Sequence, residues 1–153
     1  MGSYNCNNDL GGSQQNLSSS YKTLITALAG STPRRGRLYD LTVGADGTPA
    51  DNALIFNACR MTADDGTKTN VTPNPIDPAD PAFTGLSRAN FSAEGTVATP
   101  LLTFTINQRA TFEWVSAPEC ELVYPATSNN GLAVRAKSPA YTSTVLAGFH
   151  VEE

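Results

Sequence analysis

Three alternating stretches in residues 101–136 constrain the fold more than any other feature of the sequence. Apolar side chains occupy every second position in Leu102–Ile106, in Ala110–Trp114 and in Leu132–Ala136, with mostly polar residues between them. A repeat of two residues places alternate side chains on opposite faces of a β-strand, one face buried and the other in water. The only Trp lies in the second strand, so we expect the densest part of the core in this block.

Segments of the same kind recur on both sides of this block and predict further strands. The clearest are Arg37–Val43, Ala53–Thr62 and Tyr141–Val151. Four prolines within residues 73–81 exclude both a helix and a central strand, so residues 73–85 are predicted to form a long ordered crossing loop. About eight strands separated by Asp-Gly and Pro turns predict an all-β fold, an antiparallel β-sandwich or barrel. The crossing loop favours a jelly roll.

The first residues of the chain differ in composition from the rest. Residues 1–19 are rich in Asn, Ser, Gln and Gly and poor in apolar side chains. Such a segment buries too little surface to offset its ordering entropy, so the sequence predicts a flexible, extended N-terminal arm that a partner could order. Residues 20–153 are then the β-sandwich domain. Within it, Tyr21–Ala29 fits either an extended segment or one short helix, because its apolar spacing suits a helix and its Thr content suits a strand.

Charge restricts the classes of partner. The 153 residues carry a formal net charge of −4, which argues against direct binding of nucleic acid, since phosphate contacts need a basic face. The one basic cluster is Arg34, Arg35 and Arg37, which we expect to pair with nearby acids or to contact a protein partner. No segment resembles a signal peptide or a membrane span, so we expect no membrane partner and synthesis in a cytosol.

Residues with catalytic or metal-binding chemistry are few and scattered. His150 is the only histidine, no GxSxG motif accompanies it, and we expect it at a sheet surface. Cys6, Cys59 and Cys120 are widely spaced, which indicates free thiols; Cys59 and Cys120 could pair only if their strands meet. Acidic turns such as Asp64-Asp65-Gly66 lack the spacing of a calcium loop. The sequence therefore predicts no enzyme, no metal and no cofactor.

Several short sequence segments that occur in a fixed order carry a family resemblance. They are Arg34–Gly44, Gly47–Ala53, Pro75–Pro81, Phe91–Glu94, Asn107–Val115 and Glu121–Ala126. Together they resemble small structural proteins of tailed-phage and prophage genomes, of the capsid cement or decoration type, over about residues 24–153. The resemblance implies a jelly-roll-like fold, assembly as a homodimer or homotrimer, and binding to the major capsid protein on the exterior of the virion. It also implies synthesis in the host bacterial cytoplasm, and it brings no catalytic residues with it.

The residues most suited to contacting the capsid are the basic cluster and one aromatic. We expect the N-terminal arm and the cluster of Arg34, Arg35 and Arg37 to reach across a seam between capsid subunits, with Tyr21 as a further candidate contact. The alternative is a phage fibre head or another receptor- or carbohydrate-binding β-module. Such a site would need exposed aromatics, for which the candidates are Tyr4, Tyr21, Tyr124 and Tyr141, although Tyr124 and Tyr141 fit core or interface positions better. A minor tail or head-completion protein is a third class, which differs from the others in copy number.

Overall fold

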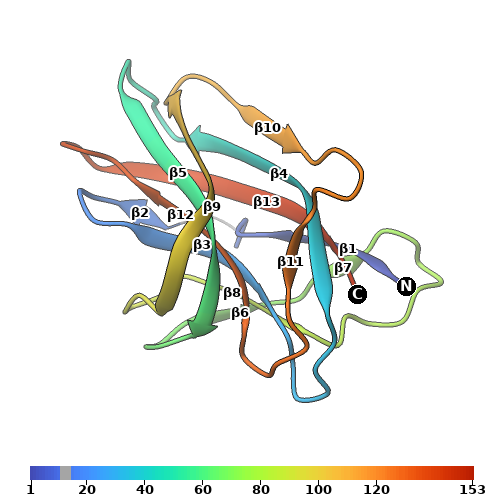
Figure 1. Ribbon diagram of the computed structural model, residues 1–153. Coiled ribbons are helices and arrows are strands. Elements are labelled where there is room, and N and C mark those ends of the chain that lie inside the picture. The colour runs from blue at the N-terminus through green and yellow to red at the C-terminus, as the bar shows by residue number, and fades with distance from the viewer. Residues whose placement is uncertain (11–14) are drawn as a thin grey trace.

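The computed structural model describes residues 1–10 and 15–153, a part of the chain that folds into two stacked antiparallel β-sheets without any helix (Figure 1). Sheet A has the order β10 (Phe112–Val115), β4 (Gly36–Asp46), β13 (Ser143–Glu152), β1 (Ser3–Asn7) and β7 (Asn74–Pro75), with β11 (Leu122–Tyr124) also on β4 and β2 (Asn16–Leu17) also on β13. Sheet B has the order β6 (Thr69–Val71), β8 (Leu86–Ala89), β3 (Lys22–Leu28), β12 (Gly131–Lys137), β5 (Ala53–Ala63) and β9 (Thr96–Asn107). The prediction of an all-β fold with antiparallel strands is confirmed, with more strands than the eight expected. None of the described segments is a helix long and apolar enough to span a membrane.

The core lies between the two sheets and follows the period-two pattern. In β13 every second residue from Ser143 to Val151 points inward and is buried, and the residues between them face outward. The largest fully buried side chains of the core come from both sheets and include Tyr4, Leu24, Leu38, Leu54, Phe56, Tyr124 and Phe149. The apolar faces of both sheets are thereby removed from water, which is the main stabilising term for a sandwich of this size.

The prediction that residues 101–136 hold the densest part of the core is wrong for two of its three strands. β9 and β10 are edge strands, and Phe104, Phe112 and Trp114 on them are only partly buried. β12 lies between β3 and β5 and is buried on both faces over most of its length. Alternation identifies the apolar face of a strand, but the place of that strand in the sheet decides how completely the face is covered.

The N-terminal residues also differ from the expectation of a mobile arm. Ser3–Asn7 forms β1, which pairs with β13 on one side and β7 on the other, and its Tyr4 and Cys6 are buried. Asn8 follows β1 and is buried as well: its amide donates to the Val145 carbonyl at 3.1 Å, and its Oδ1 accepts from Ala147 N at 2.8 Å. The expected boundary at residue 19 therefore does not separate β1 from the sandwich. Residues 11–14, which belong to the same expected arm, lie outside the described residues.

The segment left open between strand and helix is a strand. β3 covers Lys22–Leu28 and pairs with β12 and β8, and all of its side chains after Lys22 are buried. The Thr residues settle the choice, since Thr23 and Thr26 occupy buried positions in which β-branched side chains are favoured. Thr23 also donates its hydroxyl to Glu94 Oε2 at 2.6 Å, which satisfies it on the outer side of sheet B.

The proline-rich crossing loop is ordered and is attached to β1. Tyr4 donates its hydroxyl to the Pro81 carbonyl at 3.0 Å, and its ring lies 5.0 Å from that of Phe83. Ile76 N donates to the Ser3 carbonyl at 2.8 Å, next to the short strand β7. Loop and N-terminal strand thus stabilise each other, and both termini of the chain lie at the same end of the sandwich (Figure 1).

The three cysteines are free thiols, as expected, and one of them makes stability depend on alkaline pH. Burial raises the pKa of Cys6 from 9.0 to about 12. As pH rises, the Cys6 thiol loses its proton in the unfolded chain before it does so in the folded protein. The stabilisation of the folded state is therefore complete below pH 9 and is lost as pH rises from 9.0 to about 12. We expect a loss of about 4 kcal/mol between the two pKa values. Urea unfolding at pH 8 and above pH 10 measures it, and Cys6→Ala should show a smaller difference; an unchanged difference would contradict the assignment.

Candidate protein-binding surface

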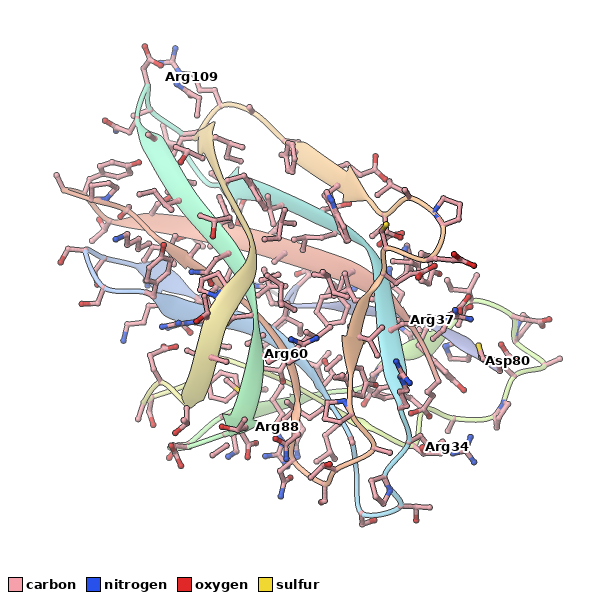
Figure 2. All side chains as sticks on the ribbon, viewed as in Figure 1. Arg34, Arg37, Arg60, Asp80, Arg88 and Arg109 are labelled. Atoms are coloured by element: carbon pink, nitrogen blue, oxygen red, sulfur yellow. The ribbon has the colours of Figure 1, made fainter. Side chains whose placement is uncertain are left out.

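The predicted basic cluster lies at the end of the sandwich that carries both chain termini. Figure 2 shows Arg34 and Arg37 there, at the start of β4. Arg37 Nε lies 2.8 Å from Glu152 Oε2 on β13, so part of the cluster pairs with a local acid as expected. Arg34 and Arg35 are exposed, and no ion pair forms on either within the described part of the chain.

Two hollows flank β11 at this end and share Arg35. The first, of about 470 Å³, is lined by Met1, Arg35, Gly36, Arg37, Glu119, Glu121, Val123, Glu152 and Glu153. The second, of about 480 Å³, is lined by Arg35, Arg60, Val123, Tyr124, Pro125 and Ala126. The first hollow therefore has mixed charge, while in the second the only charged residues are two arginines. We call these the mixed hollow and the basic hollow.

Arg60 is a member of this surface that the sequence did not reveal. It lies on β5, in the sheet opposite to β4, and it is exposed. Residues 1–10 and 15–153 offer it no carboxylate within ion-pairing distance. In the sequence Arg60 stands alone between Cys59 and Met61, and only the stacking of the two sheets brings it beside Arg35.

The wall of the basic hollow is closely packed. Tyr124 is 0% exposed, and its ring packs so closely on Gly36 that a Cβ added there would lie 2.2 Å from the phenol. Burial raises the pKa of Tyr124, so this group is neutral at physiological pH. The expectation that Tyr124 is a core residue is confirmed. Arg35 directly precedes Gly36 in the chain, so this packing limits the conformational entropy that the backbone of Arg35 loses when a partner binds.

A strained turn brings an acidic side chain to the mixed hollow. Glu119 has a φ of +65°, the left-handed region in which glycine is favoured, within a turn closed by the hydrogen bond from Cys120 N to the Ala117 carbonyl. Glu119 and Glu121 from this turn line the hollow together with Glu152 and Glu153. Of these four carboxylates, Glu152 forms a salt bridge with Arg37.

Tyr21 does not join the three arginines. It precedes β3 in sheet B, where its ring lies 5.0 Å from the guanidinium carbon of Arg135 and 4.7 Å from Lys137 Nζ. Both cations lie on β12, the neighbour of β3. The structure thus splits the predicted set into an arginine surface at one end and a tyrosine held by two cations on sheet B. Among the other aromatic candidates, Tyr4 and Tyr124 are buried and cannot serve as an exposed binding platform.

His150 lies on the outer face of sheet A, as expected, within a row of hydrogen bonds. Its Nδ1 is 2.6 Å from Asp40 Oδ2, and its Nε2 is 3.0 Å from Asn5 Nδ2. Asn7 Nδ2 donates to Asn5 Oδ1 at 2.9 Å, so the Asn5 amide group faces the ring and donates to Nε2. The proton of the ring is then on Nδ1, facing Asp40. Both ring nitrogens are occupied, and in residues 1–10 and 15–153 no group of three or more ligand side chains is placed to hold a metal ion.

Comparison with known proteins adds no assignment: no family model matches the sequence, and neither the curated proteins nor the solved structures give a match.

Proposed function

We propose that this chain is a structural protein of a tailed-phage virion, a decoration or cement protein that binds the outer surface of the head. In this role it bridges neighbouring major capsid subunits and stabilises the shell, after synthesis in the host bacterial cytoplasm. The observation that carries the proposal is the arginine surface: Arg34, Arg35 and Arg60 are exposed, and none of them forms an ion pair within residues 1–10 and 15–153. Guanidinium groups of this kind bind carboxylates on a protein partner through paired hydrogen bonds.

A jelly-roll topology is part of the proposal, and the strand pairing supports it. If the short strands β2, β6, β7, β8 and β11 are set aside, eight remain, and they pair first with last and so on inward. The pairs are β1 with β13, β3 with β12, β4 with β10, and β5 with β9. A long antiparallel hairpin wrapped into two sheets gives this order, and viral capsid domains use such jelly rolls.

Multiple copies on a shell explain how modest contacts would suffice. Each arginine contact contributes little free energy alone, but a subunit that binds at several places, or as a homodimer or homotrimer, gains from effective concentration. The net charge of −4 fits a protein partner better than packaged nucleic acid. Copy number separates this role from its alternatives: hundreds of copies on the head indicate a cement protein, whereas a few copies at a vertex, tail or fibre contradict it.

The arginine surface can be tested with a double variant. We expect R35A/R60A to bind purified expanded capsids of the encoding phage at least 10-fold more weakly than the unchanged protein, as follows from about 1.5 kcal/mol of lost charged hydrogen bonds. Co-sedimentation with capsids over a range of protein concentrations measures the affinity. Arg109→Ala is the matched control, because Arg109 lies at the opposite end of the sandwich (Figure 2).

The outcomes separate the surface from the function. Unchanged binding by R35A/R60A would contradict the role of the arginine surface while leaving the cement function standing. No binding of the unchanged protein to capsids would contradict the function itself. Equal melting temperatures of the double variant and the control exclude misfolding as the cause of a loss.

A further inference from the structure

We propose that an extended segment of the protein partner binds along the free edge of β11, and that this segment carries a basic residue directly next to an acidic one. The inference deepens the proposed function and rests on it for the expectation that the partner is another protein. The arginine surface alone would select any acidic partner. The two hollows beside β11 differ in charge, however, and a partner has to match both of them.

β11 is a strand with a free edge. Leu122–Tyr124 pairs with Gly36–Leu38 of β4, and no other strand of the described residues pairs with it. In a strand with one neighbour, about half of the backbone N–H and C=O groups point away from that neighbour and can bind another chain. An extended peptide matches such a row of donors and acceptors, as in recognition by strand addition.

The mixed hollow and the basic hollow lie on the two sides of this strand. Leu122 packs against the core and Tyr124 is buried in it, so Val123 between them points outward, opposite Arg37 of β4. Val123 lines both hollows. From it the mixed hollow extends over the outer face of sheet A towards Arg37, and the basic hollow extends towards Arg60 of sheet B. In the view of Figure 2, Arg37 and Arg60 lie on opposite sides of β11, which Figure 1 labels.

The two hollows attract side chains of opposite charge. With the shared Arg35 counted in each, the mixed hollow has four side-chain carboxylates and two guanidiniums, a formal charge of −2, and the basic hollow has a formal charge of +2. In the mixed hollow Glu152 lies 2.8 Å from Arg37, whereas Glu119 and Glu121 form no ion pair within residues 1–10 and 15–153. Complementary charge on a partner is therefore basic at the first hollow and acidic at the second.

Strand geometry determines how far apart the two charges stand in the partner segment. Consecutive side chains of a β-strand point to opposite faces. A segment added about 4.8 Å from β11 therefore places one side chain over the mixed hollow and the next one towards the basic hollow. The matching pair is one Lys or Arg followed or preceded by one Asp or Glu. A uniformly acidic segment would instead place a carboxylate against Glu119 and Glu121, where like charges repel.

Short peptides test the site without capsids. The full-length protein, labelled with nitrogen-15, is titrated with the acetylated and amidated peptides TVKEVT, TVKKVT and TVEEVT, and the shifts of its amide resonances give each affinity. We expect TVKEVT to bind about 3-fold more tightly than either of the others, because each of those replaces an exposed ion pair with a like-charge contact. Equal binding of the three peptides, no binding of TVKEVT at 10 mM, or shifts confined to residues away from β11 overturns the proposal.

A charge reversal in the mixed hollow should exchange the preference between peptides. E119K/E121K changes the formal charge of this hollow from −2 to +2, so TVEEVT should then bind about 3-fold more tightly than TVKEVT. D46K/E113K is the matched control, because it makes the same change of charge at residues that line neither hollow, and it should keep the preference for TVKEVT. The same spectra show that each variant is folded. An unchanged preference in E119K/E121K, or an exchanged one in the control, overturns the assignment.

Capsid binding separates this site from the proposed function. E119K/E121K should bind capsids at least 10-fold more weakly than D46K/E113K, because a basic side chain of the partner would meet like charges. A partner that offers only carboxylates would bind E119K/E121K more tightly, and tighter or equal binding overturns this site while leaving the cement function standing. A protein that selects TVKEVT but does not bind capsids contradicts the proposed function and leaves the site standing.

Discussion

A chain that lacks residues 1–8 is expected to lose at least 4 kcal/mol of its free energy of unfolding, a large part of the ~5–15 kcal/mol of a typical domain. The deletion removes β1 from between β13 and β7 and takes the buried Tyr4 and Cys6 out of the core. It also removes Asn8, whose side chain and backbone N–H make three hydrogen bonds to the backbone of β13. The exposed flank of β13 would then be a free sheet edge, so the truncated protein should also aggregate.

Urea unfolding followed by circular dichroism measures this loss. Tyr4→Ala in the full-length chain should reproduce most of it, about 3–5 kcal/mol, since the ring of Tyr4 is 2% exposed and packs on Phe83. Ser3→Ala is the control on the outward side of the same strand and should change stability by no more than about 0.5 kcal/mol. A deletion that leaves the free energy of unfolding within about 1 kcal/mol of the full chain would show that β1 is dispensable for stability.

Phe56→Ala should destabilise the protein by about 3–5 kcal/mol, through the lost burial of the ring and the cavity left behind. Phe56 is 0% exposed, and its ring stacks on Phe104 at 5.6 Å. Phe104 in turn lies 4.4 Å from Phe112. The three rings thus connect β5 and β9 of sheet B with β10 of sheet A. We therefore expect the contact between the edge strands β9 and β10 to loosen when the ring of Phe56 is removed.

Two measurements separate this effect from a general loss of stability. Thermal or urea unfolding gives its size, and limited proteolysis under native conditions should show faster cleavage between β9 and β10 than in the unchanged protein. Val115→Ala is the matched control on β10, where the side chain is 63% exposed and its loss should matter by no more than about 0.5 kcal/mol. A Phe56→Ala variant as stable as Val115→Ala would show that the contacts among the rings of Phe56, Phe104 and Phe112 contribute little to stability.

The contrast between β1 and the arginine surface shows where sequence reasoning stops. The polar residues of Ser3–Asn7 alternate with Tyr4 and Cys6, a pattern hidden within a segment of low overall hydrophobicity. Its strand forms because β13 and β7 offer two edges, and those partners come from distant parts of the chain. The sequence around Arg60 likewise contains nothing that indicates a place in the arginine surface. Tyr21 contacts Arg135 and Lys137 on sheet B instead of the arginines with which the sequence analysis groups it.

What the sequence determined by itself is the local conformation: a period of two and turns rich in Gly, Pro and Asp specify antiparallel strands, because each residue's φ and ψ and the face of its side chain are local properties. Only the tertiary structure decided which strands are central and which are edges. It also decided that Trp114 remains partly exposed, that β1 belongs to sheet A, and that Arg35 meets Arg60. These outcomes depend on pairings between distant residues, whose loop-closure entropy and packing energy are properties of the whole chain rather than of any segment.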